Sequence, residues 1–93
     1  MLLFGGATED GDFLNDLWIF NIMKLKWEEI ETNGEIPPPM ELHSTVLWGH
    51  CLIVIGGLIK EDKKYLTSDK IYSLDLGILY NIYFILIQWR ILL

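Results

Sequence analysis

The chain has 93 residues, enough for one small domain, and it carries a formal net charge of -6 at neutral pH. Hydrophobic residues make up 52% of the sequence and aromatic residues 13%, a composition that excludes an intrinsically disordered chain. The negative charge repels phosphate groups, so we expect no binding to nucleic acid.

The first part of the chain alternates short apolar runs with polar turns, which is typical of antiparallel β-sheets. An apolar start ends at the glycine pair Gly5 and Gly6, and a polar stretch follows it. We predict a strand over residues 17–20, a turn over residues 23–25 and a further strand over Lys26–Ile30.

The middle of the chain predicts a β-hairpin. Residues 43–48 and Cys51–Ile55 are rich in β-branched and aromatic residues, and only a two-residue turn separates them. The second of these runs has no polar alternation, so we expect a central strand that is covered on both faces. Residues 58–68 are polar and are expected to form a loop, after which residues 71–76 predict another strand.

One unit of sequence occurs twice. Residues 3–6, which end in the first glycine pair, recur as residues 54–57, at an offset of 51 residues. Residues 15–21 recur as residues 69–75, at an offset of 54 residues, and an insertion in the polar loop between the two matches accounts for the difference. Four short antiparallel strands in a unit of about fifty residues are typical of a β-propeller blade.

A family resemblance follows from the order of these features. Each glycine pair ends an apolar strand and precedes a polar loop and an aromatic strand; in the first unit Trp27, Gly34 and three prolines before His43 complete the pattern. This order resembles the kelch repeat over residues 2–76. The sequence departs from the kelch pattern at residues 40–42, because a basic residue usually stands just before the histidine.

The resemblance implies an all-β fold: a partial kelch-type β-propeller with two incomplete blades of antiparallel strands and an atypical apolar C-terminal tail. Residues 1–42 would form the end of one blade, with strands 2 to 4 and the inter-blade loop, and residues 43–76 would form strands 1 to 3 of the next. Glycines at strand ends permit positive φ and close approach of a neighbour, and large rings fill the wedge between blades. The residues of this structural motif are Gly5, Gly6, Trp18, Trp27, His43, Gly56, Gly57 and Tyr72.

The tail, residues 77–93, is mostly apolar, with 13 apolar residues among 17, and Arg90 is its only charged residue. The repeat would place the tryptophan of a fourth strand at position 81, where Asn81 stands, so we expect the tail to supply no ordinary fourth strand. As a helix, residues 78–93 would be about 24 Å long, short of a bilayer core of about 30 Å, so we expect no membrane span. A membrane anchor and an artefact of the gene model stay open as alternatives.

Loops on a rigid scaffold are where recognition usually resides. In an antiparallel blade, the turn after the second strand and the turn after the fourth emerge on the same face. The sequence predicts three loops there, over residues 7–14, 32–42 and 58–68. The candidate partner-contact residues in these loops are Glu9, Asp10, Asp12, Glu35, Glu41, Lys60, Lys63 and Lys64.

No motif for catalysis, a cofactor or a metal ion is found. His43 and His50 lie too far apart along an extended strand to share one metal ion, and Cys51 is expected to be a small buried hydrophobe. Phosphate-binding glycine loops and nucleophile elbows are absent from the sequence. We therefore expect no enzyme and no cofactor. The single cysteine fits a reducing compartment, so we expect a cytoplasmic location.

The resemblance implies a fragment of a propeller that serves as a protein-protein interaction platform through its inter-strand loops, with a protein as the partner. An alternative is the propeller portion of a larger enzyme, such as a kelch-containing phosphatase or a galactose-oxidase-like protein. Two blades expose apolar faces that need neighbours, so we also expect marginal stability and self-association.

Overall fold

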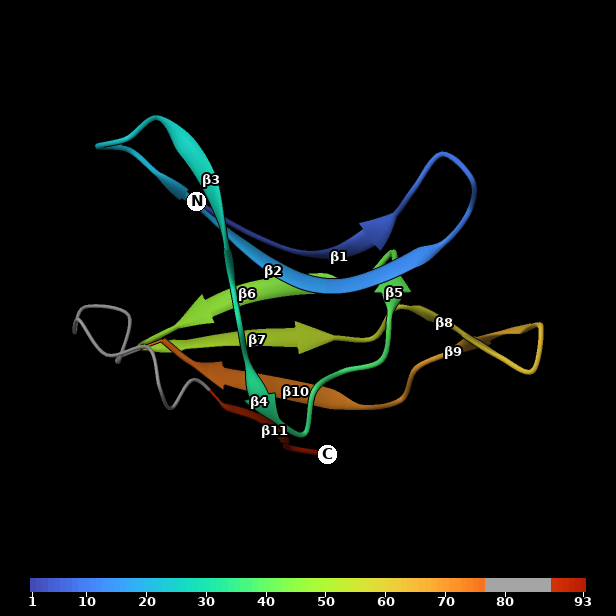
Figure 1. Ribbon diagram of the computed structural model, residues 1–93. Helices are drawn as coiled ribbons and strands as arrows, with labels where there is room; N and C mark the ends of the chain where they lie inside the picture. Colours follow the sequence, from blue (N-terminus) through green and yellow to red (C-terminus); the bar gives the residue numbers. More distant parts are fainter. Residues whose placement is uncertain (77–87) are drawn as a thin grey trace.

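The computed structural model describes residues 1–76 and 88–93, and the regular elements in those ranges are all β-strands (Figure 1). Within them, no helix is long and apolar enough to cross a membrane. The expectations for the remaining residues, Asn81 among them, lie outside the described part of the chain. The strands are β1 (Leu2–Ala7), β2 (Phe13–Asn21), β3 (Lys26–Ile30), β4 (Asn33–Gly34), β5 (Met40–Glu41), β6 (Ser44–Trp48), β7 (Cys51–Ile55), β8 (Leu58–Glu61), β9 (Lys64–Thr67), β10 (Ile71–Asp75) and β11 (Gln88–Ile91).

The first sheet is built on β2, which pairs antiparallel with β1 and with β3. In the pairing with β1, Phe4 lies opposite Leu17. Near its start β2 also pairs with β5, where Leu14 lies opposite Met40, and β5 leads on to β8 and β9. The first sheet therefore joins strands from both halves of the chain, and the strands predicted at residues 17–20 and Lys26–Ile30 are confirmed.

The second sheet has the strand order β4-β11-β10-β7-β6. Its central part confirms the predicted hairpin, because β6 and β7 pair antiparallel across the turn at Gly49 and His50. β7 lies between β6 and β10, and Leu52, Ile53 and Val54 are buried. The prediction of a covered central strand is therefore confirmed.

The repeat in the sequence is also a repeat of strand pairing. In the first sheet Leu3 of β1 lies opposite Trp18 of β2, and in the second sheet Val54 of β7 lies opposite Tyr72 of β10. The members of the two pairs are related by the offsets of 51 and 54 residues that the sequence shows. β1 therefore corresponds to β7, and β2 corresponds to β10.

The tail supplies a fourth strand to the second sheet, contrary to expectation. β11 pairs antiparallel with β10, and Trp89 lies opposite Leu74. In the first sheet Trp27 lies opposite Phe20, the residue that corresponds to Leu74. Trp89 is thus the fourth-strand tryptophan of the second unit, and it stands eight positions beyond the expected position 81.

The segment expected to be a loop, residues 58–68, is mostly a hairpin formed by β8 and β9. Its two-residue turn consists of Asp62 and Lys63, which both have positive φ, 49° and 66°. Such turns match the twist of the flanking strands. Neither residue is a glycine, and for this reason the usual hairpin signal is absent from the sequence.

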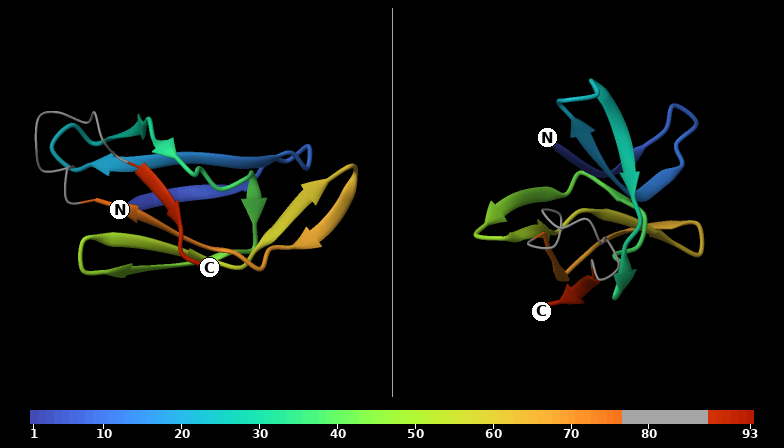
Figure 2. Two further views of the ribbon diagram at one scale, coloured as in Figure 1. Left: turned by 90° about the horizontal axis from the view of Figure 1, so that it is seen from below. Right: turned by 60° about the vertical axis from the view of Figure 1, so that its left-hand side comes forward.

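Side chains between the two sheets form the core, and Figure 2 shows the sheets facing each other. The largest of them is Trp89, which is 1% exposed and lies with its ring centroid 4.9 Å from that of Phe4. Burial of apolar surface between the sheets is the main favourable term in the stability of the fold. The buried cluster comprises Phe4, Leu17, Met40, Leu52, Val54, Tyr72, Leu74, Leu76 and Trp89.

The crossing from the first sheet to the second is held by hydrogen bonds at both ends. The Nε1–H of Trp89 donates to Oγ1 of Thr32 at 3.0 Å, and the backbone N–H of Glu35 donates to the carbonyl oxygen of Trp89 at 2.9 Å. Further along, the side-chain amide of Asn15 donates to the carbonyl oxygen of the fully buried Pro37 at 3.0 Å. The proline segment is therefore fixed against β2, and β4 is fixed against β11.

Replacing Trp89 with alanine should lower the free energy of unfolding by about 3–5 kcal/mol, because the change removes a fully buried ring and leaves a cavity. The matched control is Trp48→Ala, since Trp48 is 77% exposed and should lose less than about 1 kcal/mol. Urea titrations followed by circular dichroism, at one low protein concentration, provide the measurement. Equal losses for the two variants would contradict the position of Trp89 in the core.

Candidate functional site

The two glycine pairs meet at one histidine. His43 follows β5, and its Nε2–H donates to the carbonyl oxygen of Phe4 in β1 at 2.8 Å. A Cβ on Gly5 would stand 2.9 Å from Cε1 of His43, and a Cβ on Gly57 would stand 2.9 Å from Cβ of His43. Contacts this close leave no room for a side chain at either glycine, so His43 lies in a slot between β1 and the segment that links β7 to β8.

The ring of His43 also packs edge-on against Phe4, with ring centroids 5.6 Å apart. Its Nδ1 atom is buried and has no hydrogen-bond partner among the described residues. One ring nitrogen of His43 therefore binds β1 by a hydrogen bond while the other is buried, which indicates a structural role.

The aromatic motif residues occupy equivalent positions with different surroundings. Tyr72 is 6% exposed, and its burial raises the pKa of the phenol, with the charges of Glu35 and Asp69 adding to the shift. The corresponding Trp18 is half-buried, and its Nε1–H donates to Oδ2 of Asp16 at 2.8 Å. Trp27 packs against a neighbouring ring on β2 but is 42% exposed.

Two connections emerge at the same end of the molecule, the β1–β2 loop and the turn of the β8–β9 hairpin (Figure 1). We call residues 8–12 together with the β8–β9 hairpin the loop face. In the β1–β2 loop, the N–H of Thr8 donates to the carbonyl oxygen of Asp12 at 2.8 Å and the N–H of Gly11 donates to that of Thr8 at 3.0 Å. These bonds close the loop and leave the carboxylates of Glu9 and Asp10 exposed at its tip.

The basic half of the loop face is the β8–β9 hairpin. Lys60 of β8 lies opposite Tyr65 of β9, and its Nζ is 5.4 Å from the centroid of the Tyr65 ring. The Tyr65 ring in turn lies 5.9 Å from the ring of Phe13, the first residue of β2. Because Phe13 directly follows the acidic loop, this ring contact connects the acidic and basic parts. Lys63 and Lys64 are exposed at the turn.

The remaining two candidate contact residues lie elsewhere. Glu41 belongs to β5, lies opposite Leu58 of β8 and is half-buried at the base of the hairpin. Glu35 lies beside the second sheet, where its Oε1 accepts a hydrogen bond from the N–H of Ile91 at 3.4 Å. The structure thus brings Glu9, Asp10, Asp12, Lys60, Lys63 and Lys64 to one end of the molecule, and does not bring Glu35 there.

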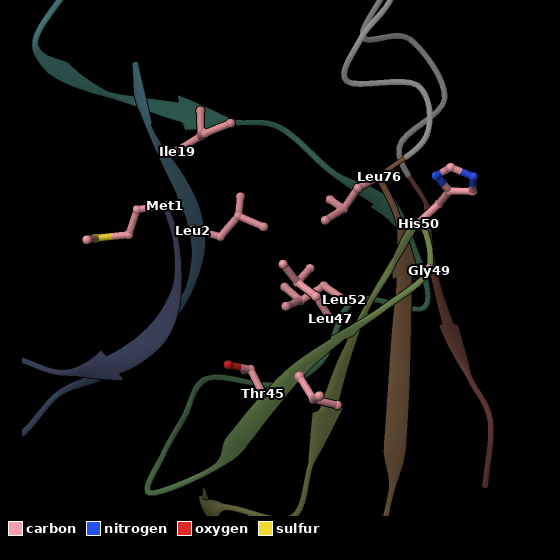
Figure 3. A pocket seen from close by; sticks show the side chains of 10 residues that line it. Met1, Leu2, Ile19, Thr45, Leu47, Gly49, His50, Leu52 and Leu76 are labelled. Atoms are coloured by element: carbon pink, nitrogen blue, oxygen red, sulfur yellow. The ribbon is translucent and has the colours of Figure 1, made fainter. Parts of the chain in front are cut away.

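An apolar cleft of about 440 Å³ opens between the sheets beside the β6–β7 turn (Figure 3). Leu2 and Ile19 of the first sheet lie across it from Leu47, Leu52 and Leu76 of the second. Among the residues that the structure describes, those that line the cleft include no carboxylate, lysine or arginine side chain. Among the described residues, no group of three or more histidine, cysteine, aspartate and glutamate side chains could hold a metal ion. The charged and aromatic side chains of the loop face lie on the exposed surface, at the other end of the molecule from the β6–β7 turn.

The sequence reasoning missed Trp89, Phe13 and Tyr65. A signal for Tyr65 was present, because Leu58 and Ile59 precede the charged residues 60–64 and Tyr65 and Leu66 follow them. Trp89 was not recognised as a strand residue, because most residues of the tail are apolar.

The slot around His43 predicts different costs for two matched substitutions. Gly5 and Gly56 are equivalent in the repeat and have nearly the same φ, 71° and 70°, but a Cβ on Gly56 would meet nothing within 4 Å. Gly56→Ala should lower the free energy of unfolding by about 1–2 kcal/mol, the cost of positive φ in a residue with a Cβ. Gly5→Ala should lower it by a further ~1–3 kcal/mol, because the added methyl group would overpack the slot. Equilibrium unfolding of both variants in urea at low protein concentration measures the difference. Equal costs would show that the slot does not exist.

Comparison with known proteins agrees with the strand pattern. The sequence model of one protein family, the KLHDC2/KLHL20/DRC7 Kelch-repeats domain, matches residues 1–83. The chain is 33% identical over 73 residues to Tip elongation aberrant protein 1 of Schizosaccharomyces pombe, and 36% identical over 71 residues to Host cell factor of Drosophila melanogaster. These matches cover 78% and 73% of the chain but only 6% and 5% of the two relatives.

A further relative is Kelch repeat-containing protein 2 of Saccharomyces cerevisiae, which is 32% identical over 74 residues. The match covers 8% of that protein. The chain thus spans less than a tenth of the length of each of these proteins. The fold class inferred from the sequence is confirmed, since the strands of both sheets pair antiparallel apart from the short parallel pair of β4 and β11. The chain belongs to the kelch-repeat family and is a piece of a kelch-type β-propeller.

Proposed function

We propose that the chain contributes to a protein-protein interaction platform and that the loop face is its contact surface. The observation that carries the proposal is the ring contact between Phe13 and Tyr65, because it holds an acidic loop and a basic hairpin in one arrangement. A surface fixed in this way loses little conformational entropy when a partner binds. The paired β-strands behind it supply the rigid support on which recognition loops depend.

The chemistry of the loop face favours a protein partner. It presents carboxylates and lysines within one surface, and Tyr65 stays 58% exposed beside Lys60. Tyrosines are enriched in protein interfaces, whose rims are polar, whereas binding of a nucleic acid needs an excess of positive charge. The proposed role is binding without catalysis. Free Cys51 supports the proposed cytoplasmic location.

Charge reversal on the loop face should abolish capture of the partner without unfolding the chain. We would compare Lys63→Glu/Lys64→Glu, Glu9→Lys/Asp10→Lys and Tyr65→Ala with the unaltered chain as tagged baits in extract from the cells that produce it. Bound proteins are quantified by mass spectrometry, and each variant should lose its specific partners at least tenfold, about 1.4 kcal/mol of binding free energy.

The control variant is Lys24→Glu/Lys26→Glu, which makes the same change of charge in the β2–β3 turn at the opposite end of the molecule. It disrupts only an exposed ion pair between Lys24 and Glu28, which contributes little to stability. The proposal is contradicted if folded loop-face variants capture the same proteins as the unaltered chain, or if the control variant loses them equally.

A further inference from the structure

Each sheet packs on the other with one side, and much of the opposite side is exposed, although Ile53 on the outer side of the second sheet is only 9% exposed. The outer side of the first sheet, which we call the head face, includes Leu3 of β1, 52% exposed, and Trp27 of β3, 42% exposed. The outer side of the second sheet, the tail face, includes Val46, 51% exposed, and Ile55, 44% exposed. Such contiguous apolar strand surfaces are uncommon on a monomer and mark sites of association.

The head face corresponds, through the sequence repeat, to the inner side of the second sheet, which packs on the first sheet. Cross-strand pairs put Leu3 on the same side of the first sheet as Trp18, and Phe20 on the same side as Trp27. Through the repeat, these four residues correspond to the four that pack from the second sheet onto the first. Those counterparts are Val54, Tyr72, Leu74 and Trp89.

The tail face corresponds, through the sequence repeat, to the inner side of the first sheet, which packs on the second sheet. Phe4 and Leu17, which are buried in the contact between the sheets, correspond to Ile55 and Ile71. Ile55 is exposed although it holds the position of Phe4 in the repeat. The chain thus contains one filled copy of a sheet-to-sheet contact and both unfilled halves of a second one.

The slot beside the tail face is also unfilled. His43 stands against Gly5, whereas nothing lies within 4 Å of a Cβ at Gly56, the equivalent glycine. A surface that the repeat builds to receive an aromatic strand is therefore open at Ile55 and Gly56. The head face offers Trp27 at the position that Trp89 occupies within the chain.

We propose that the head face of one copy of this chain packs on the tail face of a second copy, with Trp27 of the first against Ile55 of the second. The contact reproduces the packing of Trp89 on Phe4 and uses two different surfaces, so it is a head-to-tail contact. Such contacts close into a ring or continue as an open chain. Propellers close with roughly four to eight blades, so two to four copies of two sheets each would complete a ring.

Two strands of the two faces, β3 and β11, carry charges of opposite sign. Glu29 of β3 lies opposite Trp18 and so belongs to the head face, whereas Arg90 of β11 lies opposite Ser73 and belongs to the tail face. Opposite signs on two different faces favour a head-to-tail contact over contacts between two identical faces, in which like charges would meet. The apolar cleft and the loop face take no part in this contact.

Two single substitutions and their mixture test the proposal. Trp27→Glu blocks the head face and Ile55→Glu blocks the tail face; both positions are exposed within one chain, so circular dichroism should show folded proteins. Analytical ultracentrifugation should give a mass above that of the monomer for the unaltered chain, rising with concentration, and a monomer for each variant alone. The equimolar mixture should form a heterodimer, because each variant keeps the face that the other lacks.

Met23→Glu is the control, because Met23 is 93% exposed in the β2–β3 turn, and this variant should assemble like the unaltered chain. If either variant fails to fold, Leu3→Glu and Val46→Glu replace it on the head and tail faces. A monomeric unaltered chain at concentrations up to about 1 mM, an affinity below about 4 kcal/mol, would overturn the proposal. A mixture that stays monomeric, or one variant that still forms dimers by itself, would overturn it as well.

Discussion

The structure depends on the burial of Trp89 and Phe4 between two twisted sheets. Neither sheet could cover its own apolar side, and the ring contact at 4.9 Å stands at the centre of the surface that they share. Around it, Thr32 and Glu35 bind to Trp89 by hydrogen bonds, so the tail and the crossing segment are held by the same residue. Without this contact, both sheets would lose the core that keeps them together.

The position of the loop face follows from this packing. His43 fits between Gly5 and Gly57 only when the sheets stand at their observed separation, and β5 next to it joins β2 to β8. That connection brings the β8–β9 hairpin beside the first sheet, where Tyr65 meets Phe13. A core contact and a surface arrangement are thus linked through β5.

Strand positions that rest on local patterns were predictable, and those that rest on distant partners were not. The hairpin of β6 and β7 and the central place of β7 follow from apolar runs around a glycine turn. The position of β11 was not predictable from the repeat. In the first sheet only residues 22–25 connect β2 to β3, whereas residues 76–87 separate β10 from β11. The loop face was predictable in its charges but not in its ring contact, because Phe13 and Tyr65 are far apart in sequence and meet only through β5.

The most direct measurement is the nuclear Overhauser effect between the ring protons of Phe4 and Trp89 in the protein in solution. Centroids 4.9 Å apart place several proton pairs well within the range of this effect, so the account predicts clear cross-peaks between the two rings. Resolved Trp89 signals that show contacts to solvent or to the tail alone, and none to β1, would contradict the packing of the two sheets.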